Sequence, residues 1–275
     1  ITNYALILIA ILGISGLGYK FGAQTLFVAT VISLGIVGMI SDIASVFMPA
    51  AIKYIFFAAF GLGLLFHLQT RMAAFRSVSI TATDVFLLVA IVFLLRHLNS
   101  NFYFFHSADI AYLGTSLEML LADYFSPLRL FTYYPEEMTA FHKLPSGIVA
   151  YALIFFDQPT LIDAVDARFT IIVFSLFLFF RALTKHNSVL LYLFFFSVLT
   201  IYGEEMSYEF VISSYFYIIV LFGLAYTLHI KKEPPQVFVL LLIILICAKA
   251  PLFYSAFICA IVSVSIFWRK PFSRG

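Results

Sequence analysis

Charged residues are scarce in this sequence. They make up 11% of its 275 residues, whereas soluble globular chains carry about a quarter. Hydrophobic residues account for 63% of the chain, and 34 residues are phenylalanine. The composition therefore excludes an ordinary soluble domain and predicts a membrane protein, with aromatic side chains for contact with lipid and with the membrane interfaces.

Several common functional motifs are also missing. The two cysteines, Cys247 and Cys259, lie in apolar surroundings and form no CxxC, CxxCH or Cys/His metal pattern. No P-loop, GxGxxG, HExxH or GxSxG pattern occurs, which argues against the nucleotide and hydrolase sites that these motifs mark. The net charge of +2 is small and no Lys/Arg-rich run exists, so nucleic acid is not an expected partner.

The sequence does contain many long apolar segments. About ten can be drawn, and several are shorter than the roughly 20 residues that a straight span needs. No internal repeat separates them, so we expect residues 1–275 to form one all-α, multi-span membrane domain with about nine to ten transmembrane helices. The segments are Tyr4–Tyr19, Thr25–Ile40, Val46–His67, Thr81–Leu98, Pro145–Phe156, Phe169–Phe180, Ser188–Tyr202, Tyr208–His229, Val237–Ala250 and Pro251–Trp268.

Basic residues give the expected orientation in the membrane. Arg71 and Arg76 lie in one connection, and Lys231 and Lys232 lie in another. The positive-inside rule places both connections in the cytoplasm. The long segment after Leu98 then begins on the outer face, and we expect a multi-pass protein of the plasma or inner membrane.

The topology of region 145–186 stays open. A helix within Asp109–Phe125 could supply an additional crossing, and Pro145–Phe156 itself leaves two arrangements. If Pro145–Phe156 spans the membrane, Arg181 and Lys185 lie outside. If it does not span, those two residues lie inside and the preceding acidic residues lie outside with Asp42. The second topology agrees better with the charge rule. The acidic residues concerned are Asp157, Asp163 and Asp166.

Polar chemistry is concentrated in the expected external loop, Asn99–Lys143. This segment holds five of the fourteen acidic residues and two of the six histidines. Apolar residues recur at helical spacing through Ile110–Phe125, which predicts an amphipathic helix lying along the membrane surface. Its expected polar positions are Ser116, Glu118 and Asp123.

Asp109 precedes this surface helix. A carboxylate at the boundary between water and lipid can act as general base on an acceptor hydroxyl or amide. A solvated aspartate at the end of a span is the alternative interpretation.

This arrangement resembles the GT-C superfamily of integral-membrane glycosyltransferases. In that superfamily a span is followed by an acidic residue, by membrane-parallel helices, and by a Tyr/Pro-containing stretch that leads into the next span. Asp109 would be the matching acid, and Tyr134-Pro135 with His142 would lead into the next span. The stretch Asp163–Arg181 is similar to the family's pattern of an acidic or polar residue, Ala-Arg and a long apolar helix, with Arg168 matching.

The resemblance implies transfer of a sugar from a polyprenyl-phosphate-linked donor to an acceptor on the outer or lumenal face. Asp109 would be the catalytic base, and the lipid phosphate would leave. No loop has the ligand spacing of a dedicated metal site, so no metal ligand and no certain cofactor is predicted, and a divalent cation stays open. The expected partners are the lipid-linked donor and membrane lipids. The candidate substrate-binding residues are Glu118, Glu136, Glu137, His142 and Arg168.

Lys249 lies in the apolar run Val237–Trp268. An ionisable residue within a span is costly and marks a functional hypothesis. Pro251 frees backbone groups nearby, and at such a break Lys249 could bind the donor phosphate as a point charge. In the alternative interpretation, Lys249 lies in the turn between two short spans.

A second function stays open, namely a non-enzymatic membrane subunit or a transporter. A transporter is expected to contain repeats and broken helices at mid-membrane. A subunit would bury Phe-rich faces against membrane-protein partners, and Phe177–Phe180 and Phe194–Phe196 suit contact with lipid or with a partner.

Overall fold

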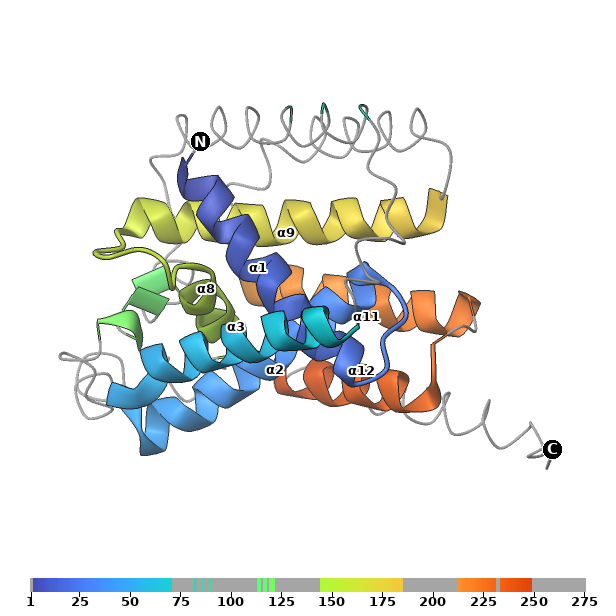
Figure 1. Cartoon of the computed structure of the whole chain (residues 1–275), viewed down its shortest axis with the longest axis horizontal. Coiled ribbons are helices and arrows are strands. Elements are labelled where there is room, and N and C mark those ends of the chain that lie inside the picture. Colours follow the sequence, from blue (N-terminus) through green and yellow to red (C-terminus); the bar gives the residue numbers. More distant parts are fainter. Residues whose placement is uncertain are drawn as a thin grey trace.

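A computed structural model describes residues 2–70, 82, 86, 90, 113–114, 116–117, 119–121, 144–184, 212–230 and 233–248. This part of the chain is helical and contains no strand, which confirms the all-α class for the described residues. Figure 1 shows its helices. They are α1 (Thr2–Lys20), α2 (Leu26–Phe47), the 3-10 turn η1 (Pro49–Ala51), α3 (Ile52–Gln69), α8 (Leu144–Ala152), α9 (Leu161–Thr184), α11 (Ile212–Ile230) and α12 (Pro235–Ala248).

In the described part of the chain, three helices are long and apolar enough to cross a membrane. The qualifying stretches are Asn3–Lys20, Leu26–Ser45 and Ile52–Gln69, of 18 to 20 residues each. At 1.5 Å per residue such helices extend about 27–30 Å, close to the hydrocarbon thickness of a bilayer. These three candidate transmembrane helices support the expectation of a membrane protein.

The second and third apolar helices begin and end later than the sequence pattern predicts. Helix α2 continues to Phe47 instead of ending near Ile40, and α3 begins at Ile52 instead of Val46. Met48 ends α2, and Pro49 opens the short turn η1 between the two helices. Proline lacks a backbone N–H and has a fixed φ, so it suits the start of a helical turn and not the interior of a long helix.

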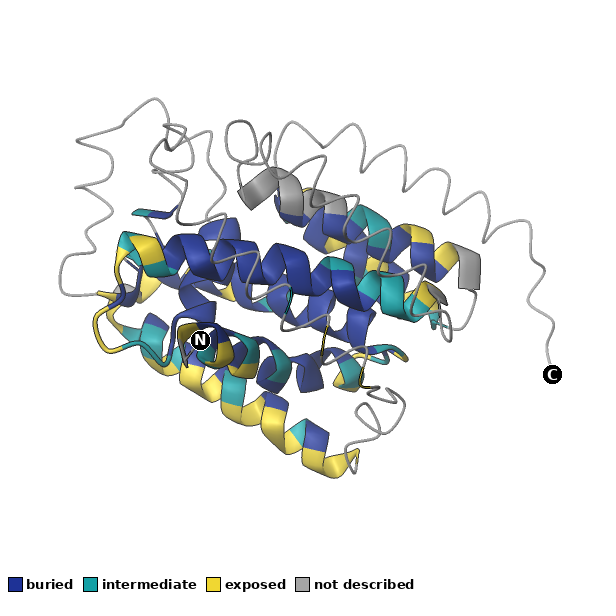
Figure 2. Cartoon of the chain, turned by 90° about the horizontal axis from the view of Figure 1, so that it is seen from above, coloured by how far each residue is buried: buried dark blue, intermediate teal, exposed yellow. Residues whose placement is uncertain are grey.

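Helix α3 lies at the edge of the bundle. Only 28% of its apolar stretch is buried, against 72% for α2. Figure 2 shows a peripheral helix with a largely exposed face beside helices that are mostly buried. The exposed side chains of α3 include Tyr54, Phe57, Leu62, Leu65 and Leu68. Such an apolar outer face is typical of contact with lipid or with another apolar surface.

Glycines bring α1 into direct backbone contact with its neighbours. A Cβ atom at Gly16 would collide with the carbonyl oxygen of Gly63 in α3, and one at Gly18 would collide with the backbone of α2. Helix α8 packs on α2 in a similar way, since a Cβ atom at Gly147 would collide with the Ser41 hydroxyl. Small residues at helix crossings are typical of membrane bundles, where packing and not the hydrophobic effect joins the helices.

The direction of α9 follows from contacts at its two ends. Near its start, Asp166 accepts a hydrogen bond from Tyr4 in the first turn of α1. Near its end, the ring of Phe179 lies 5.2 Å from that of Phe27 in the first turn of α2. Helix α9 therefore runs parallel to α1 and antiparallel to α2.

The two ends of the bundle carry different charges, and we name them accordingly. The acidic end holds the starts of α1 and α9 and the end of α2. The basic end holds the end of α1, the start of α2 and the end of α9, and α3 and α11 also end there. Lys53 and Arg168, which lie toward the acidic end, and Glu233, which lies at the basic end, are exceptions to this segregation. The other charged residues are Asp42, Asp157, Asp163 and Asp166 at the acidic end, and Lys20 and Arg181 at the basic end.

This arrangement agrees with one of the topologies expected for region 145–186. Asp163 and Asp166 lie with the start of α1, and Arg181 lies with the end of α1, as the topology with a non-spanning Pro145–Phe156 requires. That segment contains α8, a helix of nine residues whose side chains are all buried. At 1.5 Å per residue it extends about 14 Å, roughly half the thickness of the hydrocarbon layer. Buried protein surroundings are what allow a short helix to end at membrane depth.

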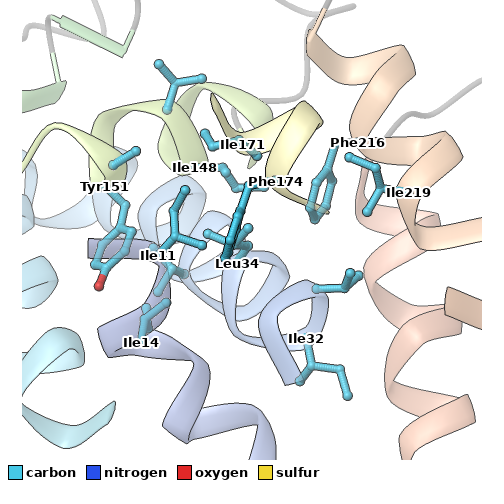
Figure 3. Close-up of a cluster of buried hydrophobic side chains, with 14 of the residues drawn as sticks. Ile11, Ile14, Ile32, Leu34, Ile148, Tyr151, Ile171, Phe174, Phe216 and Ile219 are labelled. Carbon is cyan, nitrogen blue, oxygen red and sulfur yellow. The ribbon is translucent and has the colours of Figure 1, made fainter. Parts of the chain in front are cut away.

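The core lies where α1, α2, α8, α9 and α11 meet. Figure 3 shows buried aliphatic and aromatic side chains from all five helices, among them Ile11, Leu34, Ile148, Phe174 and Phe216. Tyr151 of α8 brings its hydroxyl into this core and donates a hydrogen bond to the Ala10 carbonyl at 2.9 Å. That bond satisfies the phenol and fixes α8 against the middle of α1.

The Phe-rich face at Phe177–Phe180 contributes to the interior of the bundle. Phe177 is buried, and Phe179 stacks on Phe222 of α11 with ring centroids 4.8 Å apart. Packing among α2, α9 and α11 therefore accounts for much of a face for which we expected lipid or partner contact. Phe194–Phe196 lie outside the described residues.

The surface helix predicted at Ile110–Phe125 is described in part. Residues 113–114, 116–117 and 119–120 are helical, and the Leu121 N–H donates to the Leu117 carbonyl at 2.9 Å. Leu113 and Leu120 are buried, as the amphipathic pattern predicts. Ser116, which we expected on the polar face, is buried as well.

Glu233 fastens two connections together at the basic end. Its carboxylate accepts hydrogen bonds from the Gln24 N–H at 2.8 Å and the Thr25 hydroxyl at 3.3 Å. Thr25 is the N-cap of α2, so this carboxylate also lies at the positive end of a helix dipole. Burial raises the pKa of Glu233, and the hydrogen bonds from Gln24 and Thr25 oppose that rise.

Two glycines on α3 provide a matched test of the close packing with α1. We expect Gly63→Ala to destabilise the protein by about 1–3 kcal/mol, because its Cβ atom would lie 2.8 Å from the Ile14 Cα. Gly61→Ala should instead be neutral or stabilising by up to about 1 kcal/mol, since no atom lies within 4 Å of its Cβ position and alanine favours the helix. Unfolding by sodium dodecyl sulfate in mixed micelles measures both, and equal effects would contradict the packing.

Candidate functional site

Of the predicted site residues, the described part of the structure contains Arg168. The others lie outside the described residues, so their roles stay predictions. They are Asp109, Glu118, Glu136, Glu137, His142 and Lys249.

Arg168 lies in the second turn of α9, near the acidic end of the bundle. Its side chain is only 4% exposed, although the residue is charged at any physiological pH. Its guanidinium carbon lies 4.6 Å from the centroid of the Phe169 ring, within the range of a cation–π contact. A buried guanidinium in an apolar bundle is costly, which makes it a functional candidate.

A second buried charged residue, Asp166, lies two positions before Arg168. It is 8% exposed, and its Oδ1 accepts a hydrogen bond of 3.0 Å from the hydroxyl of Tyr4. Residues two apart on a helix point in different directions, so Asp166 faces α1 while Arg168 lies on another face. In the sequence, Asp166 bears only on the topology, and we did not predict it as a site residue.

Burial raises the pKa of Asp166 from 3.8 to about 6, and the nearby charge of Asp163 raises it further. The hydrogen bond from Tyr4 acts in the opposite direction. Asp166 precedes the predicted apolar span Phe169–Phe180 by three positions. A carboxyl group with a pKa near neutrality can hold or release a proton under ordinary conditions, as general acids and bases do.

Asp163 and Thr160 fix the start of α9 through a capping box. The Thr160 N–H donates to the Asp163 carboxylate at 2.8 Å, and the Asp163 N–H points back to the Thr160 hydroxyl at 3.4 Å. Asp163 also accepts a hydrogen bond of 3.0 Å from the Asn3 side chain. The first turns of α1 and α9 are therefore joined by two hydrogen bonds, Asn3 to Asp163 and Tyr4 to Asp166, which we call the α1–α9 clasp.

One buried hydroxyl lies deeper along the face of α9 that carries Arg168. Ser175 follows Arg168 by seven positions, which is two helical turns. Its Oγ is buried and has no hydrogen-bond partner. Several other hydroxyls of the described helices bond to a preceding backbone carbonyl, as Thr170 does to Asp166 at 2.7 Å, whereas Thr30 of α2 resembles Ser175 in having no partner. A buried hydroxyl without a partner costs about 1–3 kcal/mol, so Ser175 adds an unsatisfied polar group to the face of α9 that carries Arg168.

A separate buried pair, His67 and Ser15, joins α3 to α1. Their Nε2 and Oγ atoms are 3.0 Å apart, and Nε2 is also 3.0 Å from the Leu12 carbonyl. The Ser15 hydroxyl donates its proton to that same carbonyl at 2.7 Å. A nucleophilic serine would instead donate to the histidine, so we assign this pair to helix packing.

Metal ligands do not gather in the described segments. No group of three or more His, Cys, Asp or Glu side chains there could hold a metal ion. The question of a divalent cation at the predicted external site therefore stays open, because those residues lie elsewhere in the chain. No family model, curated protein or solved structure matches this chain.

The capping box predicts a local stability effect. Thr160→Ala removes the hydroxyl that caps α9, and we expect a loss of about 1 kcal/mol in the free energy of unfolding. Gln158→Ala is the matched control, because Gln158 is exposed in the same connection and such surface changes cost at most about 0.5 kcal/mol. Unfolding in mixed micelles compares the two, and a neutral Thr160→Ala would show that the cap contributes little.

Proposed function

We propose that this chain is an integral-membrane glycosyltransferase of the GT-C type. It would move a sugar from a polyprenyl-phosphate-linked donor to an acceptor on the outer or lumenal face of the membrane. Two features support it. They are the family resemblance at Asp109 and Asp163–Arg181, and the buried charged residues near the acidic end of the bundle.

The distribution of charge supports the side on which the reaction takes place. Lys20 and Arg181 lie at one end of the bundle, where α3 and α11 also end, and Arg71 and Lys231 follow these two helices in the sequence. The positive-inside rule makes this the cytoplasmic end. The acidic end, with Asp166 and Arg168 near it, would then face outward, where the lipid-linked sugar donors of this type are used.

The observation that carries the proposal is the burial of Arg168 close to the acidic end. A guanidinium presents several donors in a planar fork and is less strongly hydrated than an ammonium, so it suits a phosphate at the edge of an apolar region. The donor places its phosphate at that depth, because its polyprenyl chain stays in lipid. Ser175 adds a hydroxyl further along the same face of α9.

The proposed transfer needs one general base. Asp109 accepts the proton of the acceptor hydroxyl or amide while the acceptor attacks the anomeric carbon of the sugar. The bond between that carbon and the phosphate oxygen breaks, and the lipid phosphate leaves with the electron pair. Arg168 and Lys249 would stabilise the phosphate charge, and the acceptor would contact the external loop through Glu118, Glu136, Glu137 and His142.

One observation favours the second candidate, a transporter. Helix α8 is short, wholly buried and ends inside the bundle, and discontinuous helices of this kind form substrate sites in secondary transporters. An assay in reconstituted vesicles distinguishes the two functions. A transporter moves its solute across the membrane unchanged, and a transferase leaves free polyprenyl phosphate behind.

The role of Arg168 can be tested by the binding of a polyprenyl phosphate. The identity of the sugar is not needed, because every donor of this type leaves the same kind of lipid phosphate after transfer. We expect Arg168→Gln to weaken binding to the purified protein about tenfold to a hundredfold, the value of a charge-assisted hydrogen bond. Arg181→Gln is the matched control, since it changes the same residue type at the other end of α9. Native mass spectrometry in lipid nanodiscs measures both, and equal binding by the two variants would refute the phosphate site.

Asp109 is tested by turnover. We expect Asp109→Asn to lower transfer from a donor that the wild-type protein uses by about 10²–10⁴-fold, because a general base contributes that much. Expression and polyprenyl-phosphate binding should stay unchanged. Full activity in this variant would remove Asp109 from the mechanism, and release of free polyprenyl phosphate provides the assay.

A further inference from the structure

Asp42 is an ionisable residue inside a candidate membrane span. It belongs to the apolar stretch Leu26–Ser45, and α2 continues beyond it to Phe47, a rise of about 8 Å. The side chain is half-buried. A charged residue within a span is costly, and such residues commonly pair with a residue of opposite charge. We therefore searched the helices packed on this face of α2 for a basic partner.

Helix α12 packs beside α2 and runs in the same direction (Figure 1). Both helices begin at the basic end, where Glu233 binds the start of α2 just before α12 begins. Further along, a Cβ atom at Gly35 of α2 would lie 2.6 Å from the Cδ1 atom of Ile244 in α12. Each of these two residues lies nine positions after the first residue of its helix. The two helices are thus parallel and nearly in register.

This register brings the end of α12 close to the depth of Asp42. Asp42 follows Gly35 by seven positions, which is two helical turns, so it lies on the same face of α2. Lys249 follows Ala248, the last residue of α12, and lies five positions after Ile244. At 1.5 Å per residue, one further residue of α12 comes within about 3 Å of the depth of Asp42.

A second observation places the carboxylate of Asp42 near the end of α12. Its charge acts on the thiol of Cys247 in the last turn of that helix. Lys249, which lies outside the described residues, comes two positions after this cysteine. A lysine carries its ammonium on a flexible four-carbon stem, so an ammonium attached at this point of the chain can reach the same carboxylate.

We propose that Asp42 is the counter-ion of Lys249, and that the pair joins α2 to the end of α12 near the acidic end of the bundle. An aspartate inside a span and a lysine inside the apolar run Val237–Trp268 are each costly alone. As a pair they neutralise each other, and the loss of either partner leaves an uncompensated charge.

The pair also gives Asp42 a role that rests on the proposed function. A lysine that lacks a counter-ion in apolar surroundings loses its proton or turns toward water. Asp42 would keep the ammonium of Lys249 charged and in place for the donor phosphate. Asp42 is then a positioning residue that acts through Lys249 and does not itself contact the phosphate.

A double-mutant cycle in mixed micelles tests the pair. Asp42→Asn and Lys249→Gln each leave one charge without its partner, and we expect each to raise the ratio of unfolded to folded protein about tenfold or more. The double variant contains neither charge, so it should unfold no more readily than either single variant. Effects that multiply in the double variant would overturn the pairing.

Exchange of the two charges provides a second test. Asp42→Lys combined with Lys249→Asp restores opposite charges, so it should unfold less readily than Asp42→Lys alone. Lys53→Gln and Lys143→Gln are the matched controls, because these lysines lie in the first turn of α3 and directly before α8. Their effects should multiply with that of Asp42→Asn. Coupling of Asp42 to one of them in place of Lys249 would assign the counter-ion elsewhere and refute the proposal.

Binding of polyprenyl phosphate in lipid nanodiscs tests the positioning role. We expect Asp42→Asn to weaken binding about tenfold, whereas Asp42→Glu keeps the charge and should bind like the wild-type chain. Unchanged binding by Asp42→Asn would remove this role. If the wild-type chain does not bind the lipid at all, the proposed function fails, and the double-mutant cycle still decides whether the pair exists.

Discussion

The close backbone packing of α1 is the constraint on which the rest of the described structure depends. Glycines on α1 and α3 remove the side chains that would otherwise hold the two helices apart. Dispersion contacts fall off steeply with distance, so helices in an apolar solvent gain much from a close approach. With α1 so placed, its middle can accept the Tyr151 hydroxyl from α8, and its first turn reaches the start of α9.

The position of α1 in turn creates the polar environment at the acidic end. Tyr4 reaches Asp166 only because α1 and α9 run parallel and begin at the same end of the bundle. The capping box at Thr160 and Asp163 fixes the backbone there, so the side chains that follow it, including Arg168, are held by a well-ordered helix start. The guanidinium of Arg168 and the carboxyl group of Asp166 are thus both held near the acidic end, on different faces of α9.

At the basic end, the acidic residue Glu233 has a structural role. Glu233 binds the start of α2 and ties the α11–α12 connection to the α1–α2 connection. This isolated acid among basic residues is explained by the unpaired N–H groups and the dipole at a helix start. The sequence gives no sign of this pairing, because the two partners are more than 200 residues apart.

Composition and periodicity alone determined that the chain is helical and apolar, and they located the first three apolar helices to within several residues. They also favoured the topology with a non-spanning Pro145–Phe156, because unlike charges gather at opposite ends of membrane helices. Tertiary structure decided what local pattern cannot encode. It buried α8 and Ser116, turned Phe179 inward, and joined Tyr4 to Asp166. A hydropathy pattern is indifferent to whether an apolar face meets lipid or protein, and a hydrogen bond between residues 162 positions apart exists only once the helices have packed.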